Sequence, residues 1–257
     1  MPSGFQFDRP TPKREECFFY HTMELPSGEV IPGHWDLRGV ALDYTCRVHL
    51  SRARVLDVGS ATGFLSFYCE RRGADVTSFD IADGEVPDLI PWSDFGDKWS
   101  KVCSDVVAGL DKVKNSYWYC HSAFKSRASV YYGNIYDLPG PLGFYDVAIV
   151  GSVLLHLSNP FRALESIARH TNLLVITDGT PGWQDCREMR FLPNWVSRQQ
   201  RDPWQLMAWW QIPACAIDKM LDILGFEVLR TLTFDVTHQI EKYTQTMYSI
   251  VAKRKGI

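Results

Sequence analysis

Short apolar runs alternate with helical patterns through most of the chain. Five of the runs have the length and the β-branched or aromatic content of buried strands, and they lie at 55–58, 75–80, 129–132, 145–150 and 173–178. Strand, loop and helix follow one another in four successive units. Because strands that alternate with helices pair in parallel through right-handed crossovers, the pattern predicts an α/β fold.

The first strand ends in a turn of small residues, Gly59-Ser60-Ala61-Thr62-Gly63, before a helix that begins at Phe64. Glycine permits unusual backbone angles and a close approach of ligand, and a helix N-terminus offers free N–H groups to an anionic group. A dinucleotide-binding turn needs glycine at positions 59, 61 and 64. Ala61 and Phe64 break that spacing, so the turn predicts an anion site and disfavours NAD.

Polar or small residues also follow the later strands. Asp80 ends the second strand, where an acid can accept both hydroxyls of a ribose. Asn134 comes after the third strand, Gly151 and Ser152 come after the fourth, and Asp178 ends the fifth. Open α/β sheets bind ligands at the carboxyl ends of their strands, so these residues are expected to line one site.

Two segments resemble a known family. The D-x-G-x-x-x-G pattern of Asp57, Gly59 and Gly63 resembles the first motif of class I S-adenosylmethionine (SAM) methyltransferases. The block F-Y-D-V-A-I-V-G-S-V-L-L-H-L-S-N-P at 144–160 is similar to their fourth-strand region, in particular in a branch that includes tRNA wobble-uridine carboxymethyltransferases and many small-molecule enzymes. The resemblance covers about residues 50–252. It implies a Rossmann-like domain with a seven-stranded, mostly parallel sheet, an antiparallel last strand and helices on both faces.

The same resemblance implies SAM as the cofactor and methyl transfer as the reaction. In that family the turn backbone lies along the methionine part of SAM, and the acid after the second strand holds the ribose. A polar and an apolar residue flank the adenine, and Asn134 and Ile135 match them. The expected cofactor-binding residues are Trp35, Arg38, Asp57, Gly59, Ser60, Ala61, Gly63, Phe64, Asp80, Ile81, Asn134, Ile135, Gly151 and Ser152.

Methyl transfer depends mainly on how two reactants are positioned, and a general base is needed only where the acceptor keeps its proton. His156, just beyond the fourth strand, is the first candidate for a base or an orienting group, although a histidine at this place is often a packing residue. Asp178 and His21 are the alternative acids or bases.

The chain before the first strand is expected to form an arm and a flap (1–50), which leaves 51–257 as the methyltransferase domain. Residues 1–20 are polar and aperiodic, so a loose arm is expected there. Pro26-Ser27-Gly28 predicts a hairpin tip, and a short helix is expected at 41–50. In the flap, an arginine such as Arg38 can bind a carboxylate bidentately.

Two other segments have a distinct composition. The segment 179–212 predicts an aromatic lid over the substrate mouth, since flat aromatic walls suit a planar or apolar acceptor. A lid packed on itself and a dimer face are the alternatives. The segment 81–127 predicts an enlarged second crossover with helical spacing. The aromatic and basic residues of the lid segment are Trp183, Arg190, Phe191, Trp195, Arg198, Arg201, Trp204, Trp209 and Trp210.

Charge and cysteine content narrow the partners. A net charge of -3 and a pI near 6.2 give no electrostatic footprint for nucleic acid. No apolar run approaches the roughly 20 residues that span a bilayer, so a cytoplasmic protein without membrane contact is expected. The seven cysteines are scattered without a C-x-x-C pair, so neither a disulfide framework nor a metal site is expected. A monomer or a homodimer is expected.

These features predict a SAM-dependent methyltransferase that modifies oxygen or nitrogen of a small, aromatic or hydrophobic acceptor. One alternative is a tRNA-modifying (carboxy)methyltransferase, but Leu155 stands where that branch has a tyrosine, and its cofactor's extra carboxylate needs a polar or cationic partner. A further alternative is a SAM-binding protein without catalysis.

Overall fold

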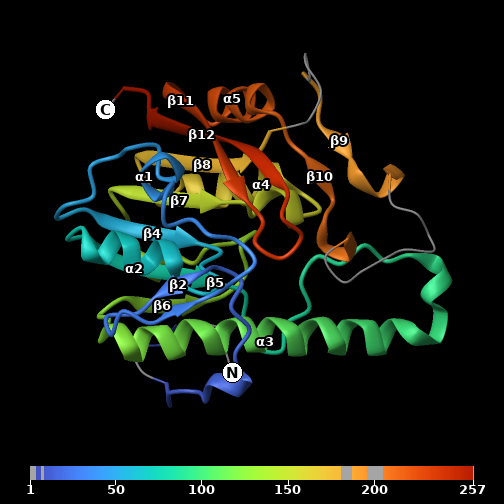
Figure 1. Ribbon diagram of the computed structural model, residues 1–257. Coiled ribbons are helices and arrows are strands. Elements are labelled where there is room, and N and C mark those ends of the chain that lie inside the picture. Colours follow the sequence, from blue (N-terminus) through green and yellow to red (C-terminus); the bar gives the residue numbers. More distant parts are fainter. Residues whose placement is uncertain (1–3, 7–8, 181–186, 196–204, 257) are drawn as a thin grey trace.

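A central sheet organises the computed structural model, which describes residues 4–6, 9–180, 187–195 and 205–256. Among these residues the sheet has eight strands, in the order β1-β6-β5-β4-β7-β8-β12-β11 (Figure 1). Five neighbouring strands are parallel and coincide with the predicted apolar runs, so the Rossmann-like α/β fold is confirmed. They are β4 (Arg54–Val58), β5 (Asp75–Asp80), β6 (Ser129–Tyr132), β7 (Val147–Gly151) and β8 (Leu173–Gly179).

The last two strands form a long hairpin. The final strand, β12 (Thr244–Arg254), lies between β8 and β11 (Phe226–Thr237) and is antiparallel to both. The predicted antiparallel last strand is therefore confirmed. Both strands extend past the end of β8, because Gly179 is the last partner of β12 and pairs with Met247. The hairpin thereby reaches beyond the carboxyl edge of the parallel strands.

The eighth strand is one more than the sequence predicted. It is β1 (Gly4–Gln6), which pairs antiparallel with β6 in the arm that was expected to be loose. An edge strand leaves backbone N–H and C=O groups unpaired, and a short extended segment satisfies them. The Phe5 ring also packs edge-on against Tyr131, with 4.9 Å between the ring centroids. Three residues are too few to produce a periodic sequence signal.

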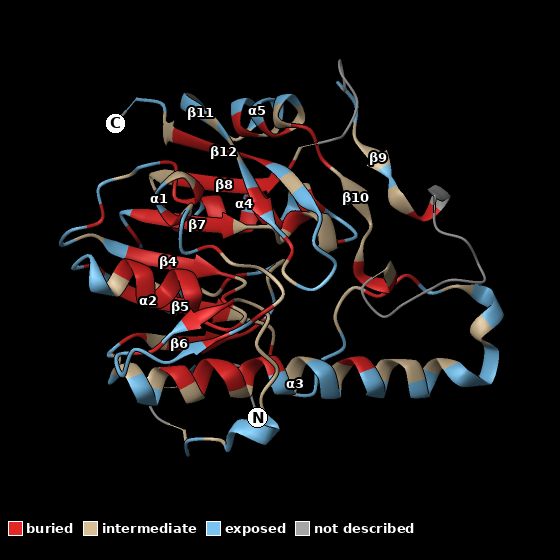
Figure 2. Ribbon diagram, in the orientation of Figure 1, coloured by how far each residue is buried: buried red, intermediate tan, exposed pale blue. Residues whose placement is uncertain are grey.

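Helices cover both faces of the sheet, and the strands between them are buried (Figure 2). Alternate strand residues serve the two faces, since Val55 packs in one core cluster and Leu56 in the other. The side chain of Asn159 accepts the N–H of Arg162 and so caps α4. The helices are α1 (Ala41–Tyr44), α2 (Phe64–Arg71), α3 (Trp99–Phe124), α4 (Pro160–Ala168) and α5 (Ala214–Ile223).

Two of these helices differ from their predicted extents. The helix α1 ends at Tyr44 instead of Leu50, because Cys46 and Arg47 have φ angles of 49° and 55°, which are not helical. The helical spacing of the 81–127 segment corresponds to the single 26-residue helix α3. It runs along the bottom of the molecule in Figure 1 and extends past the sheet.

The flap is a two-stranded ribbon of β2 (Met23–Glu24) and β3 (Val30–Ile31), joined by the predicted Pro26-Ser27-Gly28 tip. It is tied to the β11–β12 turn, where Gln239 N–H donates to the His34 carbonyl at 2.6 Å. A second small ribbon pairs β9 (Arg190–Phe191) with β10 (Trp210–Gln211). Within the described residues, no helix is both long and apolar enough to cross a bilayer.

Candidate functional site

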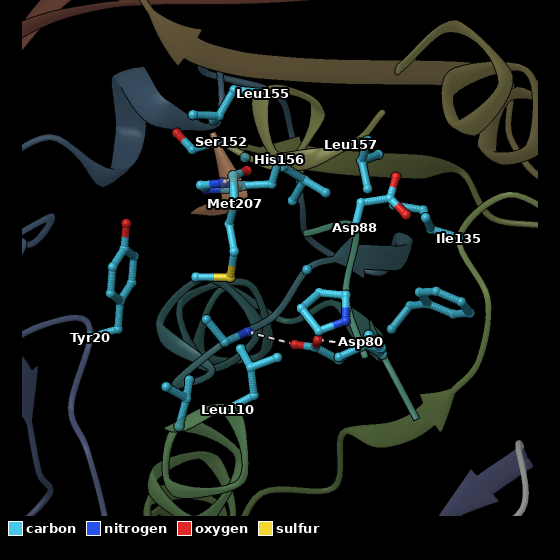
Figure 3. Close-up of a pocket in the computed structure, with 18 of the residues that line it drawn as sticks. Tyr20, Asp80, Asp88, Leu110, Ile135, Ser152, Leu155, His156, Leu157 and Met207 are labelled. Carbon is cyan, nitrogen blue, oxygen red and sulfur yellow. Dashed lines mark hydrogen bonds between the residues drawn. The ribbon is translucent and has the colours of Figure 1, made fainter. Parts of the chain in front are cut away.

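A cavity of about 710 Å³ opens at the carboxyl ends of the parallel strands. Figure 3 shows residues from separate segments around one open space, with Tyr20, Asp80, Asp88 and His156 on different sides. The predicted residues that line it are His21, Trp35, Gly59, Ala61, Asp80, Ile81, Asn134, Ile135, Gly151, Ser152, His156 and Asp178. The expectation that the strand ends converge on one site therefore agrees with their placement.

The glycine turn closes on the carboxylate of Asp80. Gly59 has φ +75°, and a Cβ at this position would lie 2.3 Å from a methyl of Val153, so only glycine fits. Ala61 N–H donates to Asp80 Oδ2 at 2.9 Å, and Ile81 N–H donates to Oδ1 at 2.8 Å. Two backbone amides thus orient a half-buried carboxylate that lines the cavity, where it can accept ribose hydroxyls.

At the next strand end, Asn134 and Ile135 form one side of the cavity. The Asn134 side-chain oxygen accepts Tyr136 N–H at 2.9 Å, which leaves the amide N–H₂ group available for an adenine edge. Asp88 braces this side, because its carboxylate accepts the Tyr136 hydroxyl and the Ser158 hydroxyl. Sequence reasoning missed Asp88, which lies in an irregular stretch without a motif.

Asp57 lies behind the turn and does not line the cavity. Its carboxylate accepts the Ser66 hydroxyl at 2.5 Å, and hydrogen bonds continue through Ser78 to Tyr117. Burial, with 1% of the residue exposed, raises the pKa of Asp57 to about 6. The side chain of Tyr117 also packs against the turn at Gly63. This buried chain joins two strands to α2 and α3, so Asp57 acts on the turn indirectly.

Arg38 also lies away from the cavity. Its guanidinium donates to Asp36 at 2.7 and 2.9 Å and to Glu24 at 3.2 Å. Arg38 and Phe64 border a separate hollow of about 230 Å³. Ser60 is outside the cavity lining too, although its hydroxyl lies 3.3 Å from Asp80 Oδ2. The carboxylate-binding role expected for Arg38 thus has no support from its placement.

We expect the substitution Arg38→Ala to change the dissociation constant for SAM less than about twofold, because the lost ion pairs are exposed and contribute about 0–1 kcal/mol to the fold. Isothermal titration calorimetry measures the constant directly. A tenfold loss of affinity for SAM at unchanged thermal stability would show that Arg38 contributes to the cofactor site.

Tyr44 covers the strand end at Gly151, and sequence reasoning missed it. A Cβ on Gly151 would lie 2.7 Å from the Tyr44 ring, so glycine allows this close contact. The Tyr44 hydroxyl lies 3.2 Å from Ser152 Oγ. Ser152 has φ +51°, an uncommon conformation for a residue with a side chain. Such backbone strain is typical of functional sites.

Asp178 is the most enclosed acid of the cavity lining, with 6% of the residue exposed. Its Oδ1 accepts the N–H of Gly179 at 2.7 Å, and burial raises the pKa of Asp178 to about 7. A Cβ on Gly179 would lie 2.0 Å from the side-chain amide nitrogen of Gln245. Gln245 therefore lies against Gly179 and lines the cavity together with Asp178, and no local pattern in the sequence marks Gln245.

The two histidines of the cavity are neutral. His21 Nδ1 lies 2.9 Å from Thr62 Oγ1, and burial lowers the pKa of His21 to about 4. His156 Nδ1 lies 2.9 Å from the Met207 carbonyl. Because a carbonyl only accepts, Nδ1 carries the hydrogen and Nε2 has the lone pair. Burial lowers the pKa of His156, and the bond to Met207 opposes this in part.

In the described part of the expected lid, residues 205–212 form a strap along one side of the cavity. Of the lid's described residues, Gly179 and Met207 line the cavity, whereas Trp209 and Trp210 do not. Their indole N–H groups donate to the carbonyls of Asp88 and Ser158, at 2.7 and 3.3 Å. These tryptophans fasten the strap instead of walling the acceptor site. The residues Trp183, Arg198, Arg201 and Trp204 lie outside the described residues.

Comparisons with known proteins agree with this geometry. The family described as a methyltransferase domain matches residues 39–231. The ubiquinone biosynthesis O-methyltransferase of Xylella fastidiosa (strain M23) is 50% identical over 66 residues, and the match spans a quarter of each chain. Two solved structures share the fold at lower identity. Magnesium protoporphyrin IX methyltransferase from Synechocystis PCC 6803, with bound S-adenosylhomocysteine, has a TM-score of 0.53 at 17% identity over 85% of this chain and 82% of that one. The 1,6-didemethyltoxoflavin-N1-methyltransferase of Burkholderia thailandensis has a TM-score of 0.52 at 13% identity over 85% and 80%.

Proposed function

The chain belongs to the methyltransferase-domain family and is a SAM-dependent methyltransferase, and we propose that it methylates an oxygen or nitrogen of a small, aromatic or hydrophobic acceptor. One observation carries the proposal. A single cavity joins Asp80 and Asn134, which suit the cofactor, to Asp178, which suits an acceptor with a removable proton. Its volume lies within the roughly 300–1,000 Å³ of small-molecule sites.

The cofactor-side residues fit the chemistry of SAM. Asp80 offers carboxylate oxygens to the ribose, and Asn134 and Ile135 offer an amide and an apolar surface to the adenine. Gly59 and Ala61 keep the turn thin enough for the methionine part. Gly151 and Ser152 lie on the methyl side, beside Tyr44.

The acceptor side is mostly apolar. Its walls come from the flap, the loop after β7 and the β11–β12 hairpin, and they include Leu37, Leu155, Val236 and Met247. Apolar walls with few polar groups favour a small hydrophobic acceptor. The curated relative from Xylella fastidiosa carries an O-methyltransferase name, which adds support for a small acceptor.

When bound, SAM supplies a methyl group on a sulfonium sulfur. The leaving group is a neutral thioether, so it departs without help from an acid. The protein then has to orient the acceptor and receive its proton. Within the described residues Asp178 Oδ2 accepts no hydrogen bond, and the pKa of Asp178 lies near the working range, so Asp178 is the proton acceptor. His156 holds the strap through Met207, and neutral His21 orients the flap side of the cavity through Thr62.

A carboxymethyl-transferring tRNA enzyme fits this cavity less well. The extra carboxylate of its cofactor would enter the methyl side, where Asp178 is the nearby charged group. Within the described residues, Lys114 is the one lysine or arginine of the lining, and it is paired with Asp83 at 3.1 Å. Like charges without a counter-ion repel, so ordinary SAM is favoured.

Calorimetry with SAM, S-adenosylhomocysteine and NAD tests the proposal, together with transfer of radiolabelled methyl groups to small-molecule pools and to tRNA. SAM and S-adenosylhomocysteine are expected to bind with one site per chain, and NAD is expected not to bind. Absence of SAM binding would refute the proposal. Label or a carboxymethyl group recovered in tRNA would favour the alternative, and binding without any transfer would favour a non-catalytic protein.

The substitution His156→Asn separates a positioning role from a base. Asparagine can place an N–H₂ group near the Nδ1 position and keep the bond to Met207, but it has no basic nitrogen. We expect kcat to fall less than about tenfold, whereas loss of a general base costs about 100-fold or more. His156→Ala, which also loses the bond to the strap, is expected to raise KM further. A loss above 100-fold in His156→Asn would make His156 the base.

A further inference from the structure

Most of the charged side chains that line the cavity are acidic. In the described residues its lining includes the carboxyl groups of Asp80, Glu85, Asp88 and Asp178, but the single cation Lys114. Asp80 is held by backbone amides and Asp88 by two hydroxyls. Lys114 serves Asp83 outside the acceptor side. The acceptor side therefore has a negative group without a protein counter-ion.

Asp178 is that group. One of its oxygens accepts the Gly179 N–H, and within the described residues the other accepts no hydrogen bond. It is 6% exposed and lines the cavity, so the second oxygen faces the space that an acceptor would fill. Burial of a carboxylate without a counter-ion is costly, and proteins rarely keep one without a ligand that pairs with it.

Aromatic rings surround the same space. Tyr20, Trp35 and Tyr44 all line the cavity. The Trp35 ring is fixed by the β11–β12 turn, because its centroid lies 4.8 Å from the ring of His238 and 5.8 Å from that of Tyr243. Aromatic faces attract cations, and an ammonium group beside both a carboxylate and aromatic rings gains from each.

We propose that the acceptor is a small primary or secondary amine that binds as its ammonium ion, with Asp178 as counter-ion between the walls of Tyr20, Trp35 and Tyr44. This inference rests on the proposed function and makes the enzyme an N-methyltransferase. An acceptor that is a carboxylate, a phosphate or a phenolate would bring a second negative charge to Asp178. The apolar walls accept the carbon skeleton of the amine.

The cavity supplies the proton acceptor that this reaction needs. The ammonium passes one proton to the Asp178 carboxylate and becomes a neutral amine. Its nitrogen lone pair forms a bond to the methyl carbon as the carbon–sulfur bond breaks, and that bonding pair stays on sulfur. The positive charge moves from sulfur to the methylated nitrogen. Asp178 returns its proton to solvent when the product leaves.

A set of matched fragments tests the inference on the intact chain saturated with S-adenosylhomocysteine. The set comprises 2-phenylethylamine, 2-phenylethanol and 3-phenylpropanoate, with alkyl amines, alcohols and carboxylates of similar size. Binding is measured by ligand-observed NMR titration, and methyl transfer by radiolabelled SAM. Amines are expected to bind about 10- to 100-fold more tightly than the matched alcohols, as for a charge-assisted hydrogen bond, and carboxylates are expected not to bind.

Two variants make the result specific. Asp178→Asn is expected to remove the preference for amines while S-adenosylhomocysteine affinity stays within about twofold. Gly179→Ala, whose methyl group displaces the flexible Gln245 amide, is expected to weaken the fragments and to spare the cofactor. Equal or tighter binding of alcohols or carboxylates, a preference for amines that persists in Asp178→Asn, or no binding by any amine would overturn the inference. Failure to bind S-adenosylhomocysteine would instead overturn the cofactor assignments of the proposed function.

Discussion

Asp80→Asn is expected to weaken SAM binding by about 100-fold or more. The carboxylate accepts the N–H groups of Ala61 and Ile81 at 2.9 and 2.8 Å and would accept the ribose hydroxyls on its free lone pairs. Hydrogen bonds to a charged group contribute about 1.5–3 kcal/mol each, and asparagine loses at least two of them. Asparagine also turns one acceptor into a donor, which opposes an N–H group of the turn. Calorimetric titration with SAM measures the loss.

The control for this variant lies on the same strand. Asp75→Asn removes an exposed carboxylate from the other end of β5, so it matches the change in charge without touching the cavity. We expect Asp75→Asn to bind SAM like the wild type. Circular dichroism and thermal unfolding show whether each variant keeps its fold. If Asp80→Asn stays folded and loses less than fivefold in affinity, then Asp80 does not hold the ribose.

The sequence predicted the parts of the site that depend on strand ends. Asp80, Asn134 and Asp178 each end or follow an apolar run, and parallel pairing brings such positions to one edge. Gly59 was predictable for a related reason, since glycine is the usual residue where a tight turn takes φ above zero, and this turn has φ +75° at Gly59. These inferences use local patterns and one general rule of topology, so they need no knowledge of distant packing.

Side-chain direction and long-range contacts were beyond the same reasoning. Asp57 alternates with its strand neighbours and so faces α2 instead of the cavity. The Arg38 guanidinium pairs with Asp36, two residues away, so it is not directed toward the ligand site. Tyr44 and Gln245 reach the cavity from segments about 200 residues apart, and nothing local marks either. The eighth strand escaped prediction because three residues carry no period.

Burial of the Asp178 carboxylate destabilises the fold, and the substitution Asp178→Asn is expected to remove this destabilisation. The folded pKa of about 7 lies above the ordinary value of about 3.9, so the folded chain binds more protons than the unfolded chain between about pH 4 and 7. The contribution of Asp178 to stability therefore falls as pH rises through that window and is constant above it. Three units correspond to about 4 kcal/mol at most, and we expect a gain of about 2 kcal/mol for the variant at pH 8.

Urea unfolding at pH 5 and pH 8 measures this gain. Asp57 also has a raised pKa, but it is present in both proteins, so the difference between them isolates Asp178. We expect the stabilisation to be larger at pH 8 than at pH 5, where the wild-type carboxyl is mostly protonated. Equal stabilisation at both values would mean that packing, and not the buried charge, explains the effect.

The same substitution should reduce methyl transfer by about 100-fold or more, as expected for loss of a positioned base. For the wild type, kcat/KM should rise with pH up to an apparent pKa near 7, because only the ionised Asp178 receives a proton. The variant should lose this limb of the pH profile. A profile that keeps the limb at pH 7 in Asp178→Asn would assign the limb to another group. Greater stability together with lower activity is the combination that identifies a charge kept for catalysis.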